Sequence, residues 1–294
     1  MVKPDSLKAW LLAARPKTLS ASATPVVAAS ALAFHDGGFR WIPALLCLVF
    51  ALLAQVVSNF ANDYFDYRKG ADDAERLGPK RAVAEGWILP SAMLRATLVL
   101  LAIDLIIGLL LLPYGGWPLV FVGLAVAVFA LAYSGGPYPL AYHGWGDVCV
   151  LIFFGIVPVG FTYFLQTGHW TFSALICGLA CGLAIINILV ANNFRDRTLD
   201  EKANKRTSIV IFGERFGSLF YLFNGIAASA CCLVFIAGKA WLAAFLPMIY
   251  LVFHIATWME MKRIWQGKAL IAVLEKTARN VLIFGLTLAA GLIL

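Results

Sequence analysis

Residues 44–73 read "ALLCLVFALLAQVVSNFANDYFDYRKGADD", an apolar stretch that runs directly into a segment rich in Asp and Asn. A helix of about twenty apolar residues is long enough to cross a bilayer. Over the whole chain 62% of residues are hydrophobic and 13% are charged, whereas soluble domains have about 25% charged residues. The sequence therefore predicts an all-α integral membrane protein.

Nine segments of this kind predict a single domain, residues 1–294, that forms a bundle of nine transmembrane helices. The expected spans are 19–36, 41–61, 92–112, 117–134, 148–166, 172–192, 216–238, 240–259 and 278–294. All of the 23 Lys and Arg residues except Arg40 and Lys239 then fall on one side. The positive-inside rule places that side, and the N-terminus, in the cytoplasm. This topology also accounts for most of the net charge of +7, so no nucleic-acid partner is expected.

The polar residues that end the second expected span fall on one helical face, at i, i+3, i+4 and i+7: Asn59, Asn62, Asp63 and Asp66. Gly70 then allows the chain to turn, which would bring Asp72 or Asp73 back toward that face. Ordinary solvation of a helix end is the simpler explanation for one such cluster.

A second cluster ends the sixth expected span, where Asn192, Asp196 and Asp200 are spaced i, i+4 and i+8. Asn192 follows Asn62 by 130 positions, which suggests a parallel internal repeat. Like charges on one face repel each other, so a cation is expected nearby. Carboxylate and amide oxygens suit Mg²⁺ that also binds phosphate oxygens, and neighbouring Lys and Arg side chains would contact the phosphates directly.

Five motifs in order resemble the UbiA superfamily of intramembrane prenyltransferases, and most closely its 1,4-dihydroxy-2-naphthoate polyprenyltransferases of menaquinone biosynthesis. The motifs are "RPKTL" (15–19), "SNFANDYFDYRKGAD" (58–72), "RLGPKRAVAEGWI" (76–88), "YSGGPYPLAYHGWGD" (133–147) and "NNFRDRTLDEKANKRT" (192–207). The resemblance covers the whole chain. It implies a central cavity capped by cytoplasmic loops, in a bacterial inner membrane, with the active site facing the cytoplasm.

The resemblance also implies roles for individual residues. The metal ligands would be Asn62, Asp63, Asp66, Asp72, Asp196 and Asp200. The diphosphate would be held by Arg76, Arg81 and Lys205, with Lys69 and Arg195 as further cations beside the two clusters. Asp66 and Asp196 would serve catalysis directly, because metal ions held between the clusters would stabilise the departing diphosphate.

The motif after the fourth expected span carries the candidates for the acceptor side. Tyr133 and other aromatic side chains would shield an allylic cation from water. Asp147 would orient an acceptor hydroxyl or take a proton, unless it is simply a helix N-cap. The loop after Tyr133 lacks the Lys or Arg that hydroxybenzoate enzymes place there, which disfavours that acceptor.

The expected reaction transfers a polyprenyl group from polyprenyl diphosphate to an aromatic acceptor, with membrane lipid around the protein. The resemblance implies 1,4-dihydroxy-2-naphthoate as acceptor, with decarboxylation to demethylmenaquinone. Homogentisate or 4-hydroxybenzoate are alternatives within the superfamily. A secondary transporter is the alternative from another class, since Asp104 would lie inside the third span and transporters also contain buried acids.

Overall fold

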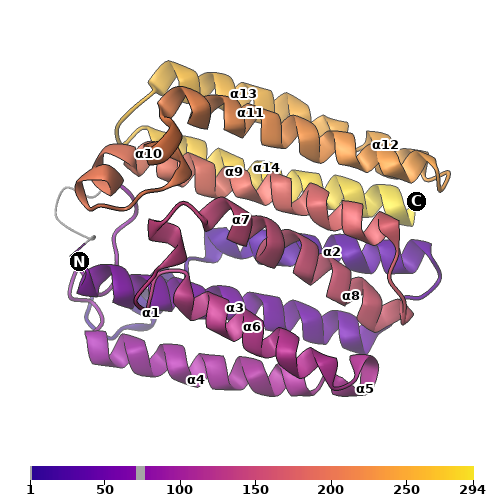
Figure 1. The fold of residues 1–294 in the computed structure, drawn as a ribbon, viewed down its shortest axis with the longest axis horizontal. Coiled ribbons are helices and arrows are strands. Elements are labelled where there is room, and N and C mark those ends of the chain that lie inside the picture. Colours follow the sequence, from indigo (N-terminus) through magenta and orange to yellow (C-terminus); the bar gives the residue numbers. More distant parts are fainter. Residues whose placement is uncertain (1, 71–76) are drawn as a thin grey trace.

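The chain folds into long helices that run side by side, as the computed structural model of residues 2–70 and 77–294 shows (Figure 1). No strand occurs in these described ranges. The elements are α1 (Leu7–Ala14), η1 (Pro16–Thr18), α2 (Leu19–His35), α3 (Trp41–Arg68), α4 (Pro90–Leu109), α5 (Leu112–Gly115), α6 (Pro118–Ala132), η2 (Leu140–Tyr142), α7 (Gly146–Leu151), η3 (Ile152–Ile156), α8 (Val157–Thr167), α9 (Phe172–Lys202), α10 (Ser208–Phe212), α11 (Glu214–Cys231), η4 (Cys232–Ile236), α12 (Trp241–Phe245), α13 (Met248–Ile264) and α14 (Leu270–Ile293).

Within the described residues, seven helical segments are long and apolar enough to cross a membrane: 41–68, 90–109, 146–167, 172–202, 214–236, 241–264 and 270–293. The membrane bundle is thus confirmed, but two of the nine expected spans are shorter. Helix α2 has 17 residues, ten of them buried, because its Ala-rich surface packs against α14, α8 and α3. Helix α6 has 15 residues, since Pro118 starts it and the glycine-rich turn after Tyr133 ends it.

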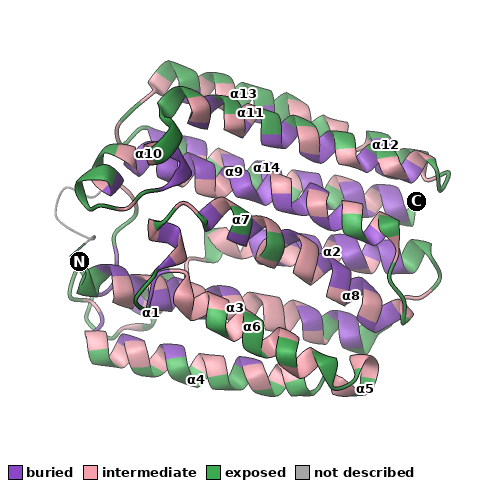
Figure 2. Cartoon of the chain, viewed as in Figure 1, coloured by how far each residue is buried: buried purple, intermediate pink, exposed green. Residues whose placement is uncertain are grey.

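Helix α9 forms the centre of the bundle, with 67% of its apolar window buried, while α4 lies at the outside with 17% (Figure 2). Helix α9 also packs against η3, a turn of π-helix between α7 and α8. A Cβ on Gly155 would lie 2.6 Å from both the Gly178 carbonyl oxygen and the Gly182 Cα. The two backbones therefore touch directly, which only glycine permits.

The two acidic clusters end α3 and α9 at the same end of the bundle, on the left in Figure 1. Helix α1 packs beside α3 there, with the rings of Trp10 and Phe60 5.5 Å apart. The loop from α6 to α7 and the short helix α10 cover this end (Figure 1). The N- and C-termini lie at opposite ends of the bundle.

Candidate active site

A cavity of about 730 Å³ runs between the helices from the acidic end toward the far end. At the acidic end its walls are polar and charged: Asn62, Asp66, Arg81, Asn192 and Lys205. At the far end they are apolar, with Leu111, Leu119 and Leu165. The cavity therefore joins a charged compartment to a long hydrophobic one.

The first acidic cluster is divided between the cavity and the loop that follows it. Asp66 faces the cavity and accepts hydrogen bonds from the Tyr142 hydroxyl (3.0 Å) and the Arg81 guanidinium (3.4 Å). Asp63, one residue after Asn62, points elsewhere. Its two carboxylate oxygens accept the backbone N–H groups of Ala82 (3.0 Å) and Val83 (3.2 Å), and it is absent from the cavity lining. Asp63 thus anchors the segment that carries Arg81.

Asn62 also lines the cavity, and its side-chain oxygen accepts a hydrogen bond from the Ser134 hydroxyl (2.6 Å). Ser134 belongs to the loop after α6, so this bond ties that loop to α3. The ammonium group of Lys69 donates to the Ser134 carbonyl oxygen at 2.6 Å and lies 4.4 Å from the centre of the Tyr142 ring. Burial lowers the pKa of Lys69 below its ordinary value, and the charge of Asp66 opposes this.

In the second cluster, Arg195 is fully buried and pairs with its own neighbour. Its Nε donates to Asp196 Oδ1 at 2.7 Å, and one of its terminal nitrogens donates to Asn192 Oδ1 at 2.8 Å. Arg195 is absent from the cavity lining, so the structure places it as the counter-ion of Asp196. Only Asn192 of this group lines the cavity.

Lys205 joins the two clusters. Its ammonium lies 3.4 Å from Asp200 Oδ1 and lines the cavity, while Asp200 Oδ2 is buried without a hydrogen-bond partner. Burial alone would lower the pKa of Lys205, but the carboxylates of Asp200, Asp66 and Asp196 outweigh it and hold the pKa above its ordinary value. Lys205 is therefore the ion-pair partner of Asp200 and also lies in the field of Asp66 and Asp196, which pair with Arg81 and Arg195.

The donor set fits a hard cation that is completed by phosphate oxygens. In the described part of the chain no three His, Cys, Asp or Glu side chains are close enough to hold a metal among themselves. Asp200 nevertheless supplies an unpartnered oxygen, Oδ2, and the cavity-facing Asp66 carboxylate has further lone pairs beside its bonds to Tyr142 and Arg81. Such a partial shell suits Mg²⁺, which retains several oxygen ligands from water and phosphate. Asp72 and Arg76 lie outside the described residues.

On the opposite side of the polar end, Tyr133 and Asp147 both line the cavity. The N-cap of α7 is Trp145, and Asp147 in its first turn makes no capping hydrogen bond, so the capping interpretation of Asp147 is wrong. Asp147 Oδ1 and the Ser208 hydroxyl are both buried, and they interact with each other without forming a hydrogen bond of standard geometry. Sequence reasoning missed Ser208, because nothing in "KRTS" indicates that α10 brings it to the cavity.

Other candidates lie away from this site. Tyr138 is 53% exposed and stacks on His143 with ring centres 3.7 Å apart, outside the cavity lining. Asp104 is buried on α4, also outside the lining, and one of its oxygens has no hydrogen-bond partner.

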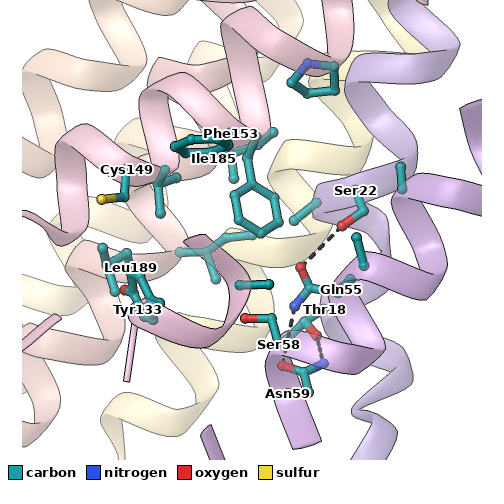
Figure 3. Close-up of a pocket in the computed structure, with 18 of the residues that line it drawn as sticks. Thr18, Ser22, Gln55, Ser58, Asn59, Tyr133, Cys149, Phe153, Ile185 and Leu189 are labelled. Carbon is teal, nitrogen blue, oxygen red and sulfur yellow. Dashed lines mark hydrogen bonds between the residues drawn. The ribbon is translucent and has the colours of Figure 1, made fainter. Parts of the chain in front are cut away.

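A row of amides and hydroxyls forms one wall of the cavity's middle section (Figure 3). The Ser22 hydroxyl donates to Gln55 Oε1 (3.1 Å), Gln55 Nε2 donates to Asn59 Oδ1 (3.2 Å), and Asn59 Nδ2 donates to the Ala14 carbonyl (2.9 Å). Phe153, Ile185 and Leu189 face this row across the cavity. The middle section is thus polar on one side and apolar on the other, which suits a flat aromatic molecule that carries polar groups along one edge.

Comparison with known proteins gives consistent matches over most of the chain. The profile of the UbiA prenyltransferase family matches residues 22–274. The 1,4-dihydroxy-2-naphthoate octaprenyltransferase of Haemophilus influenzae is 35% identical, over 80% of this chain and 79% of its own. The enzyme of the same name from Escherichia coli is 33% identical, over 98% of this chain and 96% of its own.

Among solved structures, a UbiA homolog from Archaeoglobus fulgidus bound to GPP and Mg²⁺ aligns with a TM-score of 0.67 at 14% identity. The alignment covers 96% of this chain and 99% of that one. At this identity the likeness shows the shared fold.

Proposed function

The chain belongs to the UbiA prenyltransferase family, and we propose that it transfers a polyprenyl group from polyprenyl diphosphate to 1,4-dihydroxy-2-naphthoate. The C–O bond to the diphosphate breaks and a C–C bond to the ring forms. Carbon dioxide and a proton leave, which gives demethylmenaquinol, the hydroquinone form of demethylmenaquinone. The observation that carries this proposal is a single cavity with carboxylates and cations at one end and an apolar length at the other. The two naphthoate-enzyme relatives support the choice of acceptor.

The polar end would receive the diphosphate of the donor. Asn62 and Asp66, which line the cavity, would hold Mg²⁺ together with Asp196 and Asp200, which lie outside its lining, and with Asp72 from outside the described residues. Bound Mg²⁺ supplies positive charge to the leaving diphosphate. Lys205, Arg81 and Lys69 would contact the phosphate oxygens, and Arg76 would join them. Asp63 and Arg195 would act indirectly, through the loop and the carboxylate that they hold.

The acceptor would lie between the Tyr133 side and the Ser22–Gln55–Asn59 row. Asp147 and Ser208 have buried polar atoms whose mutual contact falls short of a standard hydrogen bond, and a bound hydroxyl would satisfy both. Asp147 would orient that hydroxyl and take the proton that leaves the ring system. The ring of Tyr133 and the apolar wall would keep water from the allylic cation.

In the membrane, we propose nine crossings, with α2 and α6 as the two short ones, and a cytoplasmic N-terminus. The distribution of Lys and Arg supports this orientation, as do termini at opposite ends of the bundle. The active site would then face the cytoplasm of a bacterial inner membrane.

Prenyl transfer by the purified protein in detergent tests the function. Labelled octaprenyl diphosphate is offered with Mg²⁺ and, in turn, 1,4-dihydroxy-2-naphthoate, homogentisate and 4-hydroxybenzoate. We expect the purified protein to form product with the naphthoate. The Asp147→Asn and Tyr133→Phe variants of the protein should lose affinity for the acceptor and keep their affinity for the prenyl diphosphate. A preference for another acceptor would contradict the substrate. Absence of transfer to every acceptor would favour a transporter, because a micelle supports no gradient.

A further inference from the structure

One arginine on the outer surface of the bundle lies where polar contacts join α13 to α14. Arg279 is an exposed residue in the third turn of α14, and the next residue, Asn280, donates from Nδ2 to the Thr257 hydroxyl of α13 at 2.9 Å. One turn nearer the acidic end, Lys276 of α14 forms an ion pair with Glu260 of α13. Exposed and partly exposed side chains of both helices form one surface there, the α13–α14 patch, which consists of Phe253, Ala256, Glu260, Arg263, Lys276 and Arg279.

Tryptophans at the far end of the bundle indicate how deep this patch lies in the membrane. Trp side chains concentrate at the interface between water and the bilayer. Four helices begin beside a tryptophan that is more than half exposed: Trp41, Trp117, Trp170 and Trp241. A hydrocarbon core of about 30 Å spans about 20 helical residues, and counting from Trp241 this distance reaches about Met261. Thr257 and Arg279 therefore lie about one helical turn inside the hydrocarbon.

The charge of Arg279 is incompletely compensated at this depth. Its contacts within residues 2–70 and 77–294 are a hydrogen bond to Asn280 Oδ1 at 3.1 Å and the ring of Phe253, whose centre is 5.5 Å from the guanidinium carbon. Both partners are neutral, whereas a guanidinium has five N–H donors. Glu260, the acid of the patch, is already paired with Lys276. Charged side chains in membranes usually face the bundle interior or pair with each other, so an exposed guanidinium here points to an anion from outside the chain.

We propose that the α13–α14 patch binds an anionic phospholipid from the leaflet at the acidic end of the bundle. Two parallel N–H groups of Arg279 hold the phosphate, and the long stem of the side chain lets the charge rise to the level of the phosphate. The Lys276–Glu260 pair is neutral as a whole, so Arg263 and Arg279 leave the patch with net positive charge. This balance favours a lipid with a net negative charge over a zwitterionic one.

The acyl chains of such a lipid have a matching surface deeper in the membrane. Exposed apolar side chains continue from the patch along both helices: Ile249, Val252 and Phe253 on α13, and Leu282 and Leu286 on α14. A soluble phosphate gains nothing from this surface and would have to leave water to reach Arg279. The occupant is therefore a lipid. The patch is separate from the reacting groups, so this inference does not depend on the proposed reaction.

Thermal stabilisation of the purified protein in detergent tests the lipid site and needs no prenyl transfer. Dioleoylphosphatidylglycerol should raise the melting temperature more than dioleoylphosphatidylcholine does. Arg279→Gln should weaken binding of the phosphatidylglycerol at least about tenfold, because it removes a charge-assisted pair of hydrogen bonds. Arg95→Gln is the matched control and should bind the lipid as the wild type does. Arg95 is exposed in the second turn of α4, on the opposite side of the bundle from α13 (Figure 1).

Arg263→Gln gives a second measurement, because this exposed side chain in the last turn of α13 can be changed with little effect on folding. It should weaken binding about threefold. Equal stabilisation by the two lipids, or a loss in Arg279→Gln no greater than that in Arg95→Gln, would overturn the proposal. If Arg279→Gln does not fold, unchanged binding in Arg263→Gln would do the same. Equal stabilisation by glycerol 3-phosphate would also overturn it, since the site would then belong to a soluble phosphate.

Discussion

Replacing Lys205 with methionine removes the cation that pairs with Asp200 and lies in the field of Asp66 and Asp196, while it keeps most of the apolar stem. The Lys205 ammonium and Asp200 Oδ1 are 3.4 Å apart, and the two side chains are 19% and 10% exposed. At an effective dielectric constant of about 20, their attraction is about 5 kcal/mol before desolvation. Breaking such a buried pair from one side destabilises a protein by about 3–5 kcal/mol. The Lys205→Met variant should therefore unfold about 6–10 °C lower, at about 2 °C per kcal/mol for a chain of this size.

The pKa of Lys205 is raised above its ordinary value of 10.5, whereas burial raises the pKa of its partner Asp200 to about 6. The attraction is therefore present between about pH 6 and strong alkali, and it is lost as Asp200 gains a proton in acid or Lys205 loses one in alkali. The melting temperature can accordingly be measured in detergent at neutral pH. Lys205→Arg, which keeps the charge, is the matched control and should melt close to the wild type. Added Mg²⁺ should stabilise Lys205→Met more than the wild type, because it replaces the missing charge and binds only the folded state.

Steady-state kinetics provide the second readout. Lys205→Met should raise the apparent KM for the prenyl diphosphate, since it removes a phosphate contact present before ionisation. If Lys205→Met melts with the wild type and its donor KM is unchanged, the ammonium is not the compensating charge and the reasoning fails.

Three further predictions concern the site and the topology. Activity should require Mg²⁺ and vanish with a chelator, and Asp66→Asn and Asp196→Asn should each lower the rate at least about 100-fold, or about 2.7 kcal/mol; near-normal turnover in either would remove it from the metal site. Tyr142→Phe, which deletes a 3.0 Å hydrogen bond to the Asp66 carboxylate, should lower donor kcat/KM about tenfold, as hydrogen bonds to charged groups contribute about 1.5–3 kcal/mol, and an unchanged value would show that the bond is dispensable. Cysteines at Lys80 and Lys239, on a thiol-free background, should be labelled from opposite sides of the membrane; labelling from one side would reject the nine-crossing topology.

The helical periodicity of the sequence predicted where the helices lie better than it predicted which interactions each side chain makes. Helical spacing put Asn62, Asp63 and Asp66 on one broad face, and Asn62 and Asp66 do line the cavity. The sequence did not predict that Asp63 would face away from the cavity. Its oxygens accept hydrogen bonds from Ala82 and Val83, and only the folded loop brings those groups to it. Ser208 lies 61 positions after Asp147, so only the tertiary fold brings its hydroxyl to the cavity.

The lengths of α2 and α6 were also not predictable from hydropathy. Hydropathy predicted two further full spans there, from composition alone. The structure gives 17 and 15 residues, because local signals at Pro118 and after Tyr133 end α6, and burial among α14, α8 and α3 shapes α2.

The backbone contact of Gly155 with Gly178 and Gly182 fixes the distance between η3 and α9. Helix α9 cannot slide or rotate against η3 without a clash, so this contact sets the separation between Asp147 on α7 and Asn192 on α9. The turn at residues 168–171 does not set this separation: Gly168 ends α8, the Trp170 ring stacks on Phe164, and Thr171 caps α9. A side chain at any one of the three glycines would instead push the two backbones apart and move Asp147 relative to Asn192.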